Sequence, residues 1–302
     1  MKGEKGVHIQ DLQSENEGET VVTIEGLDRA LTIVHITDSH IVEADHRDPR
    51  ALEIAPHFQE LFEKHTPNGE PTLEVFHRTL EHSNSLAADC TVLTGDISHF
   101  PTHASLEIIQ KSVDSLQGLY LYTLGNHDWH FPYLEWNDHT REEHYPLFAK
   151  LTGGDPAGQV VQMAGVRLIA LDNSNYQVTP HQLDFLRRQL QTGDPCLLFI
   201  HIPLYLRSLA PAVIEKWQEP IMMGAPGWTK ETRMKLMALQ DDQSTTECLH
   251  LLTERAAENL VGVFCGHVHF AHVDEVRPGR YQYVTQPGFS EGYRVIRLLP
   301  AF

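Results

Sequence analysis

Apolar and polar residues follow two different periods along this chain, and together they predict an alternation of strands and helices. Short apolar runs typical of buried strands occupy residues 21–24, 31–36, 91–94, 119–124, 197–200 and 261–265. Apolar residues recur near every third or fourth position in the segments 71–89, 103–116, 180–191 and 247–259, which predicts helices there. This alternation favours β-α-β units over most of the chain.

The pattern changes in two places that build strands without helices. Residues 160–163 and 166–171 predict a hairpin around Ala164-Gly165, and residues 271–276, 281–285 and 293–298 predict strands only. Such strands pair with their neighbours in antiparallel fashion. We therefore expect an α/β protein in which mixed sheets are covered by helices.

Two segments break the alternation. Residues 1–19 are polar and acidic, which predicts a flexible N-terminal tail before a single domain over residues 20–302. Residues 204–247 are rich in Pro, Gly, Met and Trp, which indicates a cap-like insertion. Its Met222-Met223 and Trp217/Trp228 pairs fit either an apolar wall over a pocket or ordinary packing.

The composition of the chain limits the kinds of partner and compartment that we expect. The formal net charge of −18 repels polyanions, so we expect no long nucleic acid. The longest apolar stretch, residues 196–206, is far shorter than the ~20 residues of a membrane span, and the N-terminus lacks a secretory signal. The four cysteines show no CxxC spacing and suggest buried, reduced thiols. We expect a cytoplasmic protein without membrane contact, and a homo-oligomer remains possible.

Histidine is unusually frequent, with 20 residues, and several histidines fall in short motifs that begin where a predicted strand ends. These motifs are Asp38-Ser39-His40, Gly95-Asp96, Gly125-Asn126-His127-Asp128, His201 and Gly266-His267-Val268-His269. Since ligands bind at the carboxyl ends of strands in α/β sheets, we expect these five motifs to meet in space.

The residue types in these motifs suit transition metals. Carboxylates and imidazoles together bind Zn, Mn, Fe and similar ions, whereas calcium sites are normally all oxygen. The glycines before Asp96, Asn126 and His267 allow sharp turns into the site. If the D-x-H and H-x-H segments stay extended, residues two apart face the same side and serve one cluster. Each motif alone is weak evidence, but the five together are hard to explain by packing.

In this order the motifs resemble those of the calcineurin-like metallophosphoesterase superfamily. The strings HITDSHI, TGDIS, LGNHD and CGHVH are most similar to the bacterial branch of class III cyclic-nucleotide phosphodiesterases and glycerophosphodiesterases. The resemblance implies a four-layer α/β/β/α sandwich of two mixed sheets flanked by helices. It also implies a cofactor of two divalent or trivalent metal ions, with Mn, Fe or Zn expected.

Carried over residue by residue, the resemblance implies a role for every motif. One metal would be held by Asp38, His40, Asp96 and His269. Asp96 would bridge to a second metal that is completed by Asn126, His201 and His267. His127 would donate a proton to the leaving oxygen or stabilise the transition state, and Asp128 would orient His127. A metal-bridging hydroxide would hydrolyse a small-molecule phosphate ester.

The kind of ester is less constrained. The branch resemblance favours small phosphodiesters, a phosphomonoesterase would use the same site, and a non-catalytic metal-binding scaffold is the alternative from another class. His99 stands where purple acid phosphatases have Tyr, which disfavours an iron–tyrosinate centre, and we expect a satisfied loop histidine there. Ile202 replaces the second His of the His-His-Pro-Pro found in several cyclic-nucleotide relatives.

His35, inside a strand, is expected to be a hydrogen-bonded core residue.

Overall fold

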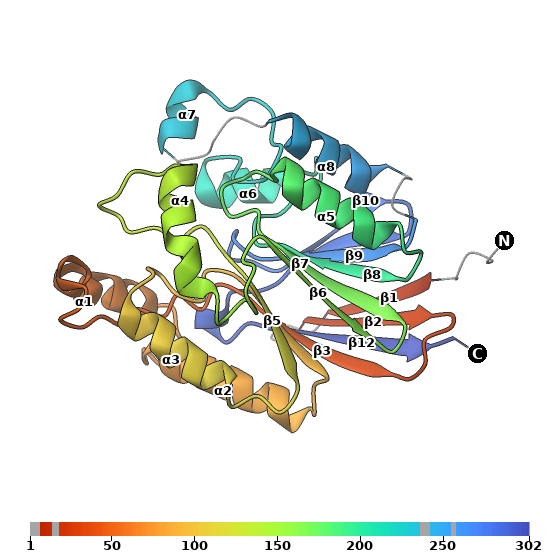
Figure 1. The fold of residues 1–302 in the computed structure, drawn as a ribbon, viewed down its shortest axis with the longest axis horizontal. Helices are drawn as coiled ribbons and strands as arrows, with labels where there is room; N and C mark the ends of the chain where they lie inside the picture. Colours follow the sequence, from red (N-terminus) through yellow and green to blue (C-terminus); the bar gives the residue numbers. More distant parts are fainter. Residues whose placement is uncertain (1–6, 14–17, 236–241, 255–257, 302) are drawn as a thin grey trace.

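Two six-stranded mixed sheets pack face to face between two layers of helices (Figure 1). The computed structural model describes residues 7–13, 18–235, 242–254 and 258–301. Helices α2 (Thr72–Ser85) and α3 (His103–Val113) cover one side of the sheet pair, and α5 (Pro180–Leu190) and α8 (Gln243–Thr253) cover the other. This arrangement confirms the predicted four-layer α/β/β/α sandwich.

The first sheet combines parallel and antiparallel neighbours. Its strand order is β1 (Val7–Gln13), β2 (Gly18–Ile24), β12 (Arg294–Pro300), β3 (Leu31–Ile36), β4 (Cys90–Thr94) and β5 (Leu119–Thr123). Strands β3, β4 and β5 are parallel, while β12 runs antiparallel to β3. The carboxyl ends of β3, β4 and β5 therefore lie at one edge of the sheet.

The second sheet repeats this plan. Its order is β10 (His272–Arg277), β11 (Arg280–Val284), β9 (Leu260–Cys265), β8 (Cys196–Phe199), β7 (Val166–Leu171) and β6 (Gly158–Met163). Strands β7, β8 and β9 are parallel. Strands β6 and β7 form the predicted antiparallel hairpin, and both Ala164 and Gly165 have the positive φ angles of a tight hairpin turn.

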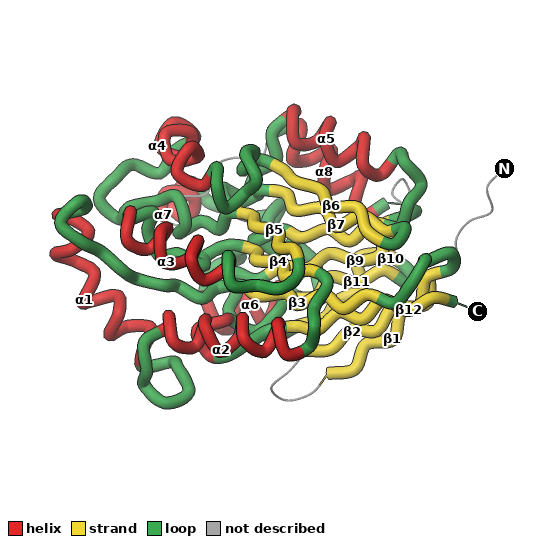
Figure 2. Tube along the Cα trace, turned by 60° about the horizontal axis from the view of Figure 1, so that its bottom comes forward, coloured by secondary structure: helices red, strands yellow, loops and turns green. Residues whose placement is uncertain are grey.

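The remaining helical elements lie in connections. They are α1 (Pro49–Glu63), α4 (Asp138–His144), α6 (Ala210–Trp217), α7 (Lys230–Lys235) and the short 3-10 turns η1 (Tyr145–Phe148) and η3 (Gly288–Ser290). Figure 2 shows green loops gathered beyond one end of the yellow strands, together with α1 and α4. No helix of the described residues is long and apolar enough to cross a membrane.

Alternation of side chains along each strand builds separate core layers. In β3, Ile33 packs between the two sheets, whereas Val34 and Ile36 pack on the helix side. His35 also lies between the sheets, where its ring nitrogens are 2.8 Å from Thr285 Oγ1 and 2.7 Å from Thr94 Oγ1. Burial lowers the pKa of His35 to about 3, so this histidine is neutral. The structure thus confirms it as a hydrogen-bonded core residue.

Several local predictions differ from the structure. The expected flexible tail over 1–19 contains β1, which pairs with β2 through backbone hydrogen bonds that need no apolar pattern. The unpredicted α1 begins with Pro49 in its first turn and contains Pro56, two residues that mask a helical pattern. The helix predicted at 247–259 starts earlier, because Asp242 caps α8 by accepting from the Thr245 backbone amide. Residues 255–257 lie outside the described part of the chain.

The insertion at 204–247 connects β8 to α8 and contains α6 and α7. Met222 and Met223 are buried in the core beside the second sheet, so their role is ordinary packing. Trp228 places its ring 5.4 Å from that of Tyr176. Residues 236–241 of the insertion lie outside the described residues. The four cysteines are buried and free, as the sequence predicted.

Candidate metal centre

The five sequence motifs meet at the carboxyl ends of the central strands. Backbone hydrogen bonds join their loops directly: Asp38 N donates to Gly95 O at 3.0 Å and His40 N to Asp96 O at 2.8 Å. Gly266 N donates to His201 O at 3.0 Å in the second sheet. The structure therefore brings all seven predicted metal ligands, together with His127, into one place between the two sheets.

Asp38, His40 and His269 form what we call the first cluster. Asp38 Oδ1 lies 3.3 Å from His269 Nε2, and His40 Nε2 lies 3.2 Å from the same nitrogen. Asp38 Oδ1 is buried and has no hydrogen-bond partner in the described structure. A buried oxygen without a partner is costly, and two imidazole lone pairs facing each other need a proton or a cation between them. The donor set fits a metal ion.

Asp96, His201 and His267 form the second cluster. His201 Nδ1 lies 2.7 Å from Thr94 O, and because a carbonyl only accepts, this nitrogen carries the proton. His201 Nε2 is thereby left as a ligand atom, 3.2 Å from Asp96 Oδ2 and 3.1 Å from Asn126 Oδ1. Asp96 Oδ2 is also 3.9 Å from His40 Nε2, so Asp96 stands between the two clusters.

The backbone of these ligands is strained in a consistent way. Asp38, His40, Asp96, His267 and His269 all have φ between 46° and 69°, the left-handed region that non-glycine residues rarely adopt. Each such residue costs about 1–2 kcal/mol. The D-x-H and H-x-H segments are therefore not extended, and tight left-handed turns aim these side chains instead. Strain concentrated on one site is typical of functional loops.

The glycines of the motifs allow the motif loops to contact one another closely, more than they allow sharp turns of the backbone. Gly95 does have a positive φ of 84°, and a Cβ there would also lie 2.2 Å from Gly125 N. A Cβ on Gly125 would lie 2.2 Å from Asp96 Oδ1, and one on Gly266 would lie 2.0 Å from Thr37 Oγ1. Any side chain at these positions would push the motif loops apart.

His127 and Asp128, which follow Asn126 in the motif, have different surroundings from each other. The His127 ring stacks on His99 with centroids 4.4 Å apart, and its backbone amide donates to Asp96 Oδ1 at 2.7 Å. The Asp128 carboxylate accepts hydrogen bonds from the backbone amides of Asp96, Ser98 and Gly125 and from the Tyr122 hydroxyl. Asp128 thus ties the motif loops together.

His99 is also more involved than a satisfied loop histidine. It is buried, and its Nδ1 lies 3.1 Å from His40 Nδ1. If His40 offers Nε2 to a metal, its proton is on Nδ1 and is donated to His99. His99 therefore supports both His40 and the stacked ring of His127.

Burial and mutual charge set the protonation of the site. Burial lowers the pKa of His267 to about 3, and the positive His201 adds to that effect. Burial acts most strongly on His201 and lowers its pKa, but the charge and hydrogen bond of Asp96, the charge of Asp38 and the Thr94 carbonyl together raise the pKa to about 9. Burial and the charge of Asp96 raise the pKa of Asp128 to about 7, against its four hydrogen bonds. Before a metal binds, His201 is thus the positive partner of Asp96.

Four side chains without a sequence motif complete the walls. Tyr176, in the loop after β7, places its hydroxyl 3.0 Å from His267 Nε2. Phe62 of α1 stacks on His40 at 4.3 Å, and Phe289 of η3 lies 5.1 Å from His269. Trp217, at the end of α6, meets His269 edge-on at 5.3 Å. The composition of the insertion pointed to Trp217 as a possible wall residue, whereas Tyr176, Phe62 and Phe289 carry no motif and were not marked by the sequence.

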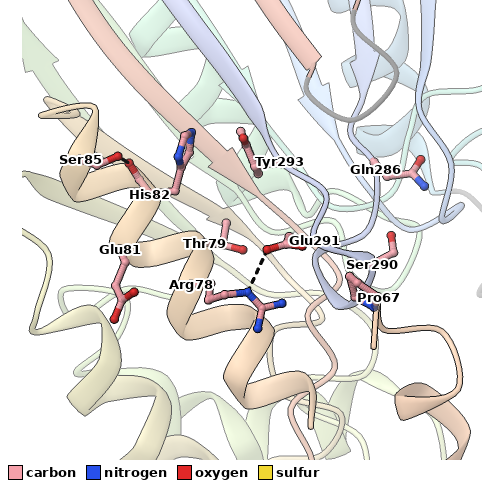
Figure 3. A pocket seen from close by; sticks show the side chains of 10 residues that line it. All are labelled: Pro67, Arg78, Thr79, Glu81, His82, Ser85, Gln286, Ser290, Glu291 and Tyr293. Carbon is pink, nitrogen blue, oxygen red and sulfur yellow. Dashed lines mark hydrogen bonds and ion pairs between the residues drawn. The ribbon is translucent and has the colours of Figure 1, made fainter. Parts of the chain in front are cut away.

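A cavity of about 770 Å³ lies between α2 and the segment 286–293 (Figure 3). None of the predicted site residues lines it. Arg78 faces the cavity and pairs with Glu291 at 3.0 Å and with Glu70 at 2.8 Å. The Arg78–Glu291 pair ties α2 to the residue that follows η3, and Phe289 of η3 contacts His269 of the first cluster.

The sequence comparison decides the family. The model for calcineurin-like phosphoesterases matches residues 31–271, which include every motif described above. The chain belongs to this calcineurin-like phosphoesterase family. The family binds a dinuclear metal centre, and membership supports a metal-dependent phosphoesterase. A search of curated proteins found no match.

Solved structures agree with the family at the level of the fold. A dimetal phosphatase from Danio rerio is 12% identical, has a TM-score of 0.51, and is matched over 89% of this chain and 92% of its own. A purple acid phosphatase from yellow lupin (Lupinus luteus) seeds is 11% identical, with a TM-score of 0.55 over 95% of this chain. This chain covers 57% of the lupin enzyme. These likenesses show the calcineurin-like fold.

Proposed function

We propose that this phosphoesterase hydrolyses small phosphate esters, phosphodiesters foremost, at two metal ions held by the two clusters. The observation that carries the proposal is the pair of adjacent clusters, in which Asp96 of the second cluster also faces His40 of the first. One ion would be held by Asp38, His40, Asp96 and His269. The second would be held by Asp96, Asn126, His201 and His267. Carboxylate, amide and imidazole donors of this kind suit Mn, Fe or Zn.

The protein side of the chemistry follows from how these residues are held. When bound, two adjacent metal ions clamp the phosphate and activate a water molecule. Asp96 would contribute to both ion sites, because its carboxylate reaches toward His40 and toward His201. Thr94 and His99 fix the tautomers of His201 and His40. The site is thus preorganised before substrate arrives.

We assign His127 the proton-transfer or transition-state role. Its backbone is tied to Asp96 and its ring is fixed against His99, so its ring nitrogens stand beside the clusters without being needed as ligands. Burial lowers the pKa of His127, which keeps its imidazole from being permanently charged. A residue with this placement donates to the leaving oxygen or stabilises charge on the phosphate.

Replacing His127 tests this role. In His127→Ala we expect kcat to fall roughly a hundredfold to ten-thousandfold, the range of general acid–base catalysis, while both metal ions stay bound. Hydrolysis and metal content are measured on the same preparation. Unchanged turnover in His127→Ala would remove it from the mechanism.

The preference for diesters has a separate test. We expect the Mn-loaded or Fe/Zn-loaded protein to turn over bis-p-nitrophenyl phosphate faster than p-nitrophenyl phosphate. The branch resemblance of the HITDSHI, TGDIS, LGNHD and CGHVH strings supports this order. Dominant monoester turnover would favour the phosphomonoesterase alternative, and absence of hydrolysis with two metals bound would favour a scaffold.

A further inference from the structure

Helix α6 of the insertion is attached to the H-x-H loop by its last two residues. Trp217 Nε1 donates to Val268 O at 2.9 Å, and Lys216 Nζ donates to His269 O. The Trp217 ring lies edge-on to the ring of His269. The end of α6 is therefore held at a fixed place beside the first cluster, although the insertion itself carries no predicted ligand.

The Lys216 ammonium lies at the rim of the metal centre. It is 5.9 Å from the Trp217 ring centroid and 5.6 Å from that of Phe270. An ammonium group has three N–H donors, and the bond to His269 O uses one of them. The side chain is exposed, so the other donors are accessible from solvent.

A positive group in this position has electrostatic consequences for substrate. The chain as a whole carries a formal charge of −18, which opposes the approach of any polyanion. The metal ions attract the phosphate that is hydrolysed, but a second anionic group on the same substrate needs its own cation. An ammonium is a compact point charge that binds carboxylate and phosphate alike.

Resting on the proposed function, we propose that Lys216 binds a second anionic group of the substrate. The preferred ester then carries, besides the phosphate at the metals, a carboxylate or a further phosphate on one arm. Trp217 and Phe270 flank the ammonium and partly shield it from water, which strengthens its attraction for an anion. The competing role for Lys216 is a simple anchor at the C-terminal end of α6.

The test uses two diesters with the same leaving group, p-nitrophenyl ethyl phosphate and p-nitrophenyl 2-carboxyethyl phosphate. We expect Lys216→Gln to raise KM for the carboxylated ester about tenfold, the equivalent of one charge-assisted hydrogen bond, and to leave KM for the ethyl ester within about twofold. Lys216→Arg is expected to keep the preference. Lys111→Gln, an exposed lysine on α3, serves as the matched control and changes neither ester.

Binding gives a readout without turnover. Calorimetry on the metal-loaded protein compares ethylphosphonate with 3-phosphonopropionate, which differ by one carboxylate. We expect the wild type to bind 3-phosphonopropionate more tightly, and Lys216→Gln to lose that difference.

An equal effect of Lys216→Gln on both esters, or an unchanged preference, would overturn the inference and leave Lys216 as an anchor. In that case hydrolysis of both esters by the wild type would leave the proposed function standing, whereas a wild type that hydrolyses neither ester would overturn the proposed function itself.

Discussion

The two clusters of the metal centre are built in different ways. The first cluster is surrounded by rings: Phe62 stacks on His40 with nearly parallel planes, and Phe289 and Trp217 border His269. All three of its residues have left-handed backbone angles. Packing and strained turns therefore determine where its ligand atoms lie.

The second cluster is instead surrounded by hydrogen bonds. Thr94 O, Asn126 Oδ1 and Tyr176 Oη are within 3.1 Å of a ring nitrogen of His201 or His267. Asn173, buried after β7, accepts from the His201 backbone amide at 3.1 Å. We therefore expect stability and metal affinity to be separable. Loss of a ring beside the first cluster should lower the stability of the fold, and loss of a hydroxyl beside the second should weaken metal binding.

Asp96 is the residue on which both clusters depend, so its replacement has the largest expected effect. In Asp96→Ala we expect the catalytic efficiency to fall roughly a thousandfold or more, since both metal sites lose a carboxylate ligand. The variant also loses a negative charge that raises the pKa of Asp128, so we expect that pKa to fall. Parallel measurement of kcat/KM and metal content tests this, and near wild-type activity would contradict the shared role of Asp96.

Replacing Phe62 tests whether ring packing beside the first cluster stabilises the fold. Phe62→Ala removes a buried ring, so we expect the free energy of unfolding of the metal-free protein to fall by about 3 kcal/mol. We expect the second cluster to keep its metal affinity. Phe76→Ala, a buried ring on α2, is the matched control that destabilises without touching His40. Denaturant unfolding and metal titration check both, and loss of both ions in Phe62→Ala alone would break the distinction.

Tyr176 tests the hydrogen-bonding side, with the smallest expected effect. Tyr176→Phe removes only the hydroxyl that meets His267 Nε2, and we expect one of the two ions to bind about tenfold more weakly. The control is Tyr120→Phe on β5, which loses a hydroxyl contact with Gln110 of α3. Competition with a chelator measures the affinities. Equal loss of both ions, or the same loss in Tyr120→Phe, would contradict a role specific to the second cluster.

Elements with a strong apolar period were predictable from the sequence. Strand β3, helix α3 and the β6–β7 hairpin lie within a few residues of their predicted positions. Strand β1 was missed because an edge strand is held by backbone pairing, and its composition is polar. Helix α1 was missed because its two prolines obscure the helical pattern.

In the site, too, some features were predictable from the sequence and others were not. Its ligands were predictable because motifs at strand ends converge by topology alone. The left-handed backbone of His40 and His269 was not, because strain arises from contacts between loops that are distant in sequence. Tyr176, Phe62 and Lys216 reach the site from a loop, a connecting helix and the insertion, and only the folded structure places them there.

The central claim is that two metal ions share Asp96. Titration of the metal-free protein with Mn²⁺, followed by calorimetry and elemental analysis, tests it most directly. We expect two ions per chain in the wild type and fewer than two in Asp96→Ala, with hydrolysis of bis-p-nitrophenyl phosphate rising only as the second ion binds. A single ion per chain that supports full hydrolysis, or two ions retained with full activity in Asp96→Ala, would contradict it.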